Sequence, residues 1–165
     1  MDPFTIIGGL AAVVQLCGTA RAVAKVAYRF ASNVGGASAE VKRFAIQVLL
    51  FCDVVEAAEL SLRNYCTENE ESPLVDFICS RRILDNIGHE AEAVEEHLRA
   101  IHDQVRGLGS SSILWASIKW TLKKSSILGL VPEMECVKSS LNLLAAICQL
   151  QRRTCSGQDG SKEEM

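Results

Sequence analysis

Apolar positions recur at intervals of three and four residues through most of this chain, and no segment alternates as a strand would. Such spacing places side chains on one face of an α-helix, which can then pack into a core. The predicted helices cover residues 3–31, 39–65, 72–106, 113–124 and 126–153. Short polar turns separate them, so the pattern predicts an all-α antiparallel bundle of four to five helices. Residues 1–153 are expected to form this bundle, and residues 154–165 a polar, disordered tail.

The first predicted helix has two chemically different halves. Residues 3–20 carry no charge, whereas Arg21, Lys25 and Arg29 follow at intervals of four and share one side of the helix. This suits a helix that enters the headgroup region of an anionic bilayer, and equally the buried first helix of a bundle. The sequence leaves both interpretations open. The membrane or interaction helix would use Phe4, Ile6, Ile7, Leu10, Val13, Val14, Arg21, Lys25 and Arg29.

The other helices have apolar stripes that predict the rest of the core. In the second helix the stripe comprises Val41, Phe44, Val48, Cys52, Val55, Glu59 and Leu62. In the third it comprises Phe77, Leu84, Ile87, Ala91, Val94, Leu98, Ile101 and Val105. In the last it comprises Leu130, Met134, Val137, Leu141, Leu144 and Cys148. The opposite side of the third helix is interpreted as a solvated acidic face of Glu90, Glu92, Glu95 and Glu96.

Composition and motifs give no indication of an enzyme. The net charge of −3 and the 5% aromatic content make nucleic acid a poor partner. A nucleotide-binding P-loop is absent from the sequence, and no residue pattern indicates a catalytic dyad. His89, His97 and His102 share one predicted helix without the spacing of a metal motif. We therefore expect no catalytic residues, no cofactor, no metal and no small-molecule substrate.

The cysteines and the N-terminus bear on the cellular compartment. The seven cysteines are odd in number, form no C-x-x-C pair, and several fall at apolar helical positions. Reduced, buried thiols in a cytoplasmic protein are the expected state, with Cys155 the most exposed. Asp2 stands where a signal peptide would need a cation, and Gly8, Gly9 and Gly18 weaken the apolar segment as a permanent membrane span. We expect a cytoplasmic protein that becomes peripheral to a membrane only on activation.

A second candidate interface lies in the short helix over residues 113–124. It comprises Trp115, Trp120, Lys123 and Lys124. Tryptophan beside lysine is typical of a membrane-interface belt or a partner groove. The two indoles could equally seal one end of the bundle core.

Two parts of the sequence resemble a known family. The chain opens M-D-P-F-T-I-I-G-G-L-A-A-V-V-Q-L, and later reads L-W-A-S-I-K-W-T-L-K-K and C-V-K-S-S-L-N-L-L. In this order the motifs resemble the N-terminal helical domain of fungal STAND or NOD-like receptors, which is similar to HeLo and HeLo-like bundles. The domain also occurs in small proteins, including ones of the azaphilone-cluster type. The resemblance spans residues 1–151.

The resemblance implies signalling in self/non-self recognition and programmed cell death. Several members act by releasing the N-terminal helix to perturb membranes. The implied partners are helical protein domains, a second copy of the domain, or an anionic membrane surface. This chain shows neither the nucleotide-binding module nor the repeats of those receptors, so oligomerisation by a nucleotide switch is not implied. The alternative is a passive helical adaptor whose first helix stays in the core.

Overall fold

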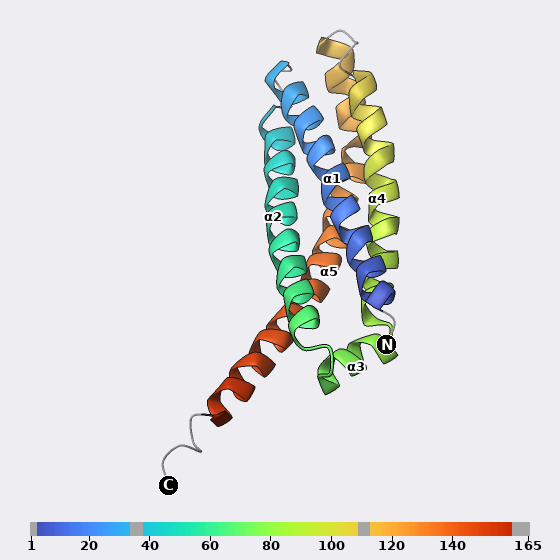
Figure 1. Ribbon diagram of the computed structural model, residues 1–165. Helices are drawn as coiled ribbons and strands as arrows, with labels where there is room; N and C mark the ends of the chain where they lie inside the picture. The colour runs from blue at the N-terminus through green and yellow to red at the C-terminus, as the bar shows by residue number, and fades with distance from the viewer. Residues whose placement is uncertain (1–2, 34–37, 109–112, 160–165) are drawn as a thin grey trace.

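The computed structural model describes residues 3–33, 38–108 and 113–159, and the described part contains helices joined by turns. The helices are α1 (Pro3–Asn33), α2 (Ser38–Glu68), α3 (Pro73–Ser80), α4 (Ile83–Leu108) and α5 (Ile113–Asp159). Four of them form a bundle, and the short α3 lies at its end (Figure 1). The predicted all-α bundle is confirmed.

The segment predicted as one helix over residues 72–106 is two helices, α3 and α4, so that prediction was wrong. Ser72 caps α3 by accepting a hydrogen bond from the backbone N–H of Leu74, and Pro73 occupies the first turn. The break comes at Arg82, whose backbone is left-handed with φ 51°. The Arg82 Nε then binds the carboxylate of Asp85 in the first turn of α4, at 2.9 Å. This contact fixes the corner between the two helices.

Helix α1 lies between α2 and α4 and contacts both along their length (Figure 1). Near its start α1 approaches α4 backbone to backbone. A Cβ on Gly9 would lie 2.3 Å from the carbonyl oxygen of Leu84, and one on Gly88 would lie 3.0 Å from the Cα of Gly9. Glycine is therefore required here because no side chain fits between the helices. Gly18, in contrast, has open space around it.

The predicted apolar stripes are buried, with one exception. In α2 all seven predicted positions are buried, Glu59 included. In α4 and α5 the predicted positions with described side chains are buried as well. Phe77, which was predicted to be core, is 52% exposed because it belongs to α3 and not to α4. The side chain of Val105 lies outside the described residues.

Helix α5 runs without a break through the region where two helices were predicted. Pro132 lies inside it, on the exposed side. Its earlier part accompanies α4, and its later part crosses to α2 and continues past the end of the bundle (Figure 1). The helix includes residues 154–159, the beginning of the segment for which a disordered tail was predicted.

Candidate functional site

Glu95 forms the polar contact between α1 and α4. This residue is only 6% exposed, and its carboxylate accepts hydrogen bonds from Thr19 Oγ1 at 2.7 Å and Gln15 Nε2 at 3.1 Å. Arg99, one turn later on α4, contributes an ion pair at 2.7 Å. A buried carboxylate is costly unless donors surround it, and two of these three donors come from α1. Removal of α1 would leave Glu95 with only Arg99.

The buried position of Glu95 corrects the sequence interpretation, which placed it on a solvated acidic face. Its neighbours Glu90, Glu92 and Glu96 are exposed, as predicted. Glu95 differs because it faces two polar side chains in the apolar half of α1, Gln15 and Thr19. Those two residues reduce the hydrophobicity of the segment, and their function in the fold is to satisfy this carboxylate.

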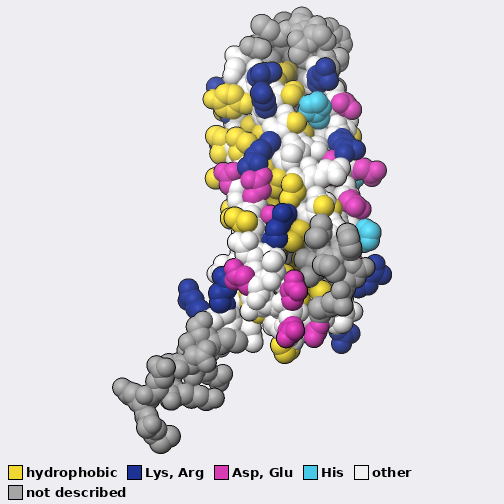
Figure 2. All heavy atoms as spheres, in the orientation of Figure 1, with side chains coloured by type: hydrophobic (Ala, Val, Ile, Leu, Met, Phe, Trp, Pro, Cys, Tyr) yellow, Lys and Arg dark blue, Asp and Glu magenta, His cyan; other side chains and the backbone are white. Residues whose placement is uncertain are grey.

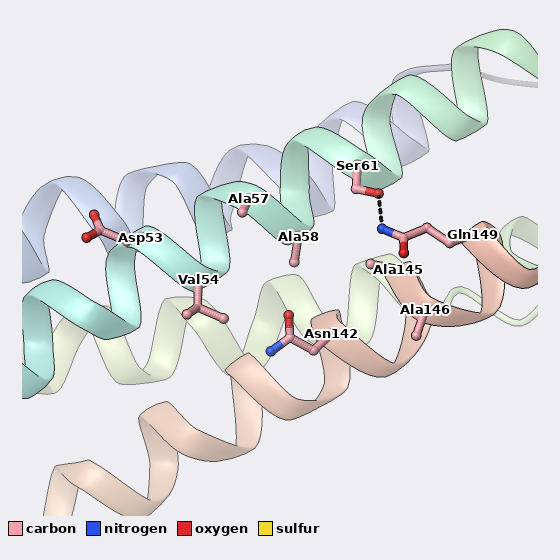
Figure 3. A pocket seen from close by; sticks show the side chains of 9 residues that line it. All are labelled: Asp53, Val54, Ala57, Ala58, Ser61, Asn142, Ala145, Ala146 and Gln149. Carbon is pink, nitrogen blue, oxygen red and sulfur yellow. Dashed lines mark hydrogen bonds between the residues drawn. The ribbon is translucent and has the colours of Figure 1, made fainter.

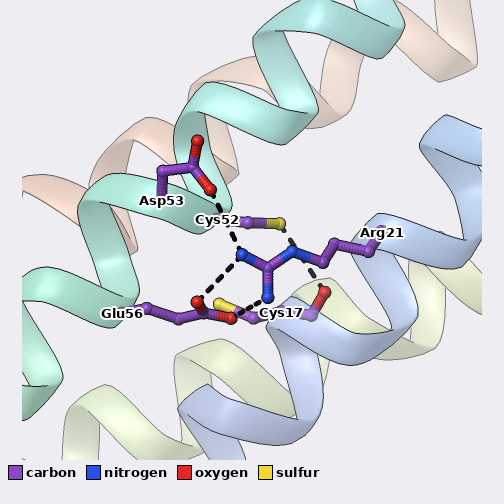
Figure 4. A network of polar contacts seen from close by, with 5 residues as sticks. All are labelled: Cys17, Arg21, Cys52, Asp53 and Glu56. Carbon is purple, nitrogen blue, oxygen red and sulfur yellow. Dashed lines mark hydrogen bonds and ion pairs between the residues drawn. The ribbon is translucent and has the colours of Figure 1, made fainter.

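Arg21 joins α1 to α2 on the outer side of the bundle (Figure 4). Its guanidinium binds the carboxylate of Glu56 with both terminal nitrogens, one of them at 2.8 Å, and lies 3.2 Å from Asp53 Oδ1. A forked contact of this kind fixes geometry. Because the three groups are largely exposed, it adds only about 0–1 kcal/mol to stability. Its main effect is to set the register between the two helices.

Buried thiols line the core beside this contact. Cys52 Sγ donates to the carbonyl oxygen of Cys17 at 3.6 Å, and the interaction with Cys52, together with burial, raises the pKa of Cys17 (Figure 4). Burial also raises the pKa values of Cys66 and Cys148 to about 11. These four unbridged thiols confirm the predicted buried cysteines. The raised pKa values keep Cys17, Cys66 and Cys148 neutral at physiological pH, which favours a packing function, whereas the contact with Cys17 lowers the pKa of Cys52. Cys155 lies outside the residues whose side chains are described.

The apolar residues predicted for a membrane-active helix divide between core and surface. Leu10 and Val13 are buried, whereas Val14 is 45% exposed. The backbone of Phe4, Ile6 and Ile7 belongs to α1, but their side chains lie outside the described residues. The folded chain therefore hides much of the surface that would enter a bilayer.

The cations predicted for the same helix also differ from one another. Arg21 is held by α2, while Lys25 and Arg29 are exposed. The other candidate interface falls at the start of α5. Its backbone is helical, but the side chains of Trp115, Trp120, Lys123 and Lys124 lie outside the described residues. The structure therefore leaves that prediction untested.

An open groove of about 450 Å³ runs between α2 and α5 (Figure 3). We call it the α2/α5 groove. Its residues are Asp53, Val54, Ala57, Ala58, Ser61, Asn142, Ala145, Ala146 and Gln149. Ala58 and Ala145 are buried and form the floor. Because the side chains of the floor are small, they do not fill the space between the two helices. The floor is therefore open to an incoming group.

The end of the groove is closed by polar contacts between α2 and α5. Gln149 Nε2 donates to Ser61 Oγ at 3.3 Å (Figure 3). Farther along, Arg152 pairs with Glu68 at 2.6 Å and places its guanidinium 6.0 Å from the ring centroid of Tyr65. Together these contacts hold the later part of α5 on α2, and so they fix the width of the groove.

The histidines bind separate carboxylates. His97 Nδ1 lies 3.0 Å from Glu133 and links α4 to α5, while His89 and His102 approach acidic residues on their own helix. Among the residues that the structure describes, no three histidine, cysteine or acidic side chains are grouped as metal ligands would be.

Comparison with protein-family models, curated proteins and solved structures gives no match for this chain. The resemblance to fungal receptor domains therefore stays a prediction from the motifs. Any functional proposal must be supported mainly by the surfaces that the bundle presents.

Sequence reasoning missed the α2/α5 groove. Its signal was two alanine pairs, Ala57-Ala58 and Ala145-Ala146, each on a helix that was otherwise rich in larger apolar residues. Paired small residues indicate a place where another helix can come close. They could not indicate a groove without the knowledge that α5 crosses to α2.

The contact between Thr19 and Glu95 can be tested by a double-mutant cycle. Thr19→Val removes a donor from a buried carboxylate, and we expect the free energy of unfolding to fall by about 1.5–3 kcal/mol. In a Glu95→Gln background the same change should cost less, with a coupling of about 0.5–3 kcal/mol. Denaturant unfolding followed by circular dichroism measures both values.

The matched control is Thr67→Val on the exposed end of α2, where the hydroxyl donates to the carbonyl of Arg63. We expect it to change stability by no more than about 0.5 kcal/mol. Strict additivity of Thr19→Val and Glu95→Gln would contradict the assigned contact.

Proposed function

We propose that this chain is a non-enzymatic signalling and interaction module of the kind found at the N-terminus of fungal STAND or NOD-like receptors. It acts by binding an amphipathic helix of another protein in the α2/α5 groove. The observation that carries the proposal is the groove itself, an apolar channel with an alanine floor between two helices. Helix-in-groove recognition uses a surface of this kind.

The chemistry of the groove supports a helical partner. Exposed leucines at positions 50, 143 and 150 stand on the outer sides of α2 and α5 near the groove. These leucines can pack against the two sides of a bound apolar helix, whose small side chains would contact the alanine floor. Asn142 and Ser61 supply polar groups that can fix its orientation. A small-molecule substrate is less suited to this open site, because such ligands are mostly enclosed by their pockets.

The position of α1 supports an adaptor in which the first helix remains in the core. Among the described side chains of α1, five large apolar ones are buried, namely Leu10, Val13, Leu16, Val23 and Phe30. Their exposure to water would cost about 8–15 kcal/mol in total. A whole domain of this size is stable by only about 5–15 kcal/mol. Release of α1 into water is therefore equivalent to unfolding the bundle.

One observation favours a second candidate, membrane engagement by α1. Residues Gly8–Ser32 are long and apolar enough to span a bilayer, because they contain an 18-residue window with a mean hydropathy of 1.4, although 44% of that window is buried in the bundle. A core helix has the same composition. A lipid surface could compensate the burial that α1 loses, and Lys25 and Arg29 are exposed to meet anionic headgroups.

The groove can be tested by filling it. We expect peptides selected for binding from a displayed library of helical sequences to carry apolar residues at intervals of three and four. Ala146→Trp places an indole in the groove and should weaken their binding by more than about tenfold, because the central anchor loses its pocket. Fluorescence anisotropy with labelled peptides measures the change.

Ala93→Trp is the control, because Ala93 is also an exposed alanine but lies on α4 and does not line the groove. It should leave peptide affinity unchanged, and both variants should keep the circular dichroism of the parent. Selected peptides that bind the Ala146→Trp protein as tightly as the parent would refute the proposed site.

The membrane candidate can be tested at Val14, because its exposure allows a charge without unfolding, whereas a charge at buried Leu10 would disrupt the core. If α1 inserts, Val14→Glu should abolish leakage of dye from anionic vesicles. Leu60→Glu, a similarly exposed change on α2, should retain it. Absence of leakage with the parent protein, or equal leakage with both variants, would exclude insertion of α1.

A further inference from the structure

Helix α2 has a second stripe on its outer side, opposite the one that packs into the core. We call it the outer α2 stripe. All its members are exposed, and they are Ala39, Arg43, Ile46, Leu50, Asp53 and Ala57. The steps between them are four, three, four, three and four residues. This heptad spacing is typical of a helix that packs lengthwise against another helix.

The centre of the stripe belongs to a larger apolar patch. Arg21 binds Asp53 and Glu56, and α1 and α2 run in opposite directions, so Tyr28 is level with Ile46 and Leu49. Tyr28, Ile46, Leu49 and Leu50 each expose between 42% and 58% of their surface. Figure 2 shows hydrophobic side chains gathered along this edge of the molecule. The charged groups of the stripe lie on both sides of these apolar residues.

The charges along α2 are self-complementary. Lys42 and Arg43 are followed by nine uncharged residues, and then by Asp53 and Glu56. Asp53 shares Arg21 with Glu56, while the ion pairs between described side chains do not include Arg43. A second α2 lying antiparallel would bring its own acidic end to Arg43 and its basic end to Asp53.

We propose that a second copy of this chain packs against the outer α2 stripe, with the two α2 helices antiparallel about a two-fold axis level with Val48. In this register Ile46 meets Leu50 of the second copy, and Arg43 meets its Asp53. Ala39 meets Ala57, so small residues close each end. Every contact occurs twice, as an isologous interface requires.

The size of the patch sets the expected strength of the dimer. Four half-exposed side chains correspond to about 120–240 Å² of apolar surface per copy. Interfaces of standard size bury about 800 Å² per partner. We therefore expect a weak, reversible dimer whose dissociation constant lies in the micromolar range. The inference goes beyond helix binding in the α2/α5 groove and does not depend on it.

The test uses charge reversal and mixing. Arg43→Glu alone sets two carboxylates against each other at both symmetric contacts, and Asp53→Lys alone sets two cations against each other. Each variant should raise the dissociation constant by about a hundredfold. An equimolar mixture of the two should regain the parent affinity, because both contacts in the mixed dimer are attractive. Sedimentation equilibrium of the full chain measures all four samples.

Recovery of dimer affinity on mixing would show that both variants are folded. Replacement of Asp53 also leaves the ion pair between Arg21 and Glu56 in place. As an apolar control, Leu50→Gln should also abolish the dimer, whereas Leu143→Gln, a change at a similarly exposed leucine on α5, should not.

Three results would overturn the proposal. They are a parent protein that is monomeric, single variants that dimerise normally, and a mixture that stays monomeric. A monomer that binds anionic vesicles, and loses that binding with Leu50→Gln, would instead assign the stripe to lipid. Peptide affinity in the α2/α5 groove is a separate measurement, so its loss through Ala146→Trp can be established whether or not the chain dimerises.

Discussion

The structure depends on the burial of α1 between α2 and α4. Gly9 and Gly88 let α1 and α4 approach until their backbones touch. Farther along the same pair of helices, the buried carboxylate of Glu95 accepts hydrogen bonds from Gln15 and Thr19. Neither feature survives if α1 moves away, because α1 supplies Gly9 to the backbone contact and two of the three donors to Glu95. The apolar composition of α1 is thus explained by its place at the centre of the bundle.

With α1 fixed inside, the two surfaces proposed for recognition lie mainly on α2 and α5, and α1 contributes Tyr28 beside one of them. Helix α2 has one face in the core, one side on the α2/α5 groove and an outer stripe with heptad spacing. Asp53 and Ala57 belong to both of the last two surfaces, and Leu50 lies near both. A partner helix and a second copy of the chain would therefore meet on neighbouring sides of α2, so that one can influence the other.

The fold could be predicted from the sequence because helical periodicity and turn residues are local signals. Every residue predicted for the core stripes of α2 and α5 is buried. Among the errors, one arose from a local backbone conformation and another from a distant contact. The left-handed Arg82 separates α3 from α4, and Glu95 is buried because α1 offers it donors. The α2/α5 groove could not be predicted for the same reason, since it depends on where α5 crosses α2. The side chains of Trp115 and Trp120 lie outside the described residues, so that predicted interface awaits a direct test.

Hydrogen exchange of the α1 amides, with and without anionic vesicles, tests the position of α1 most directly. If α1 is a permanent core helix, its amides from Leu10 to Phe30 exchange as slowly as those of α2 and α4, and vesicles leave that protection unchanged. Rapid exchange of α1 in solution would contradict this account. So would a change of protection confined to α1 when vesicles are added, with α2 and α4 remaining as before.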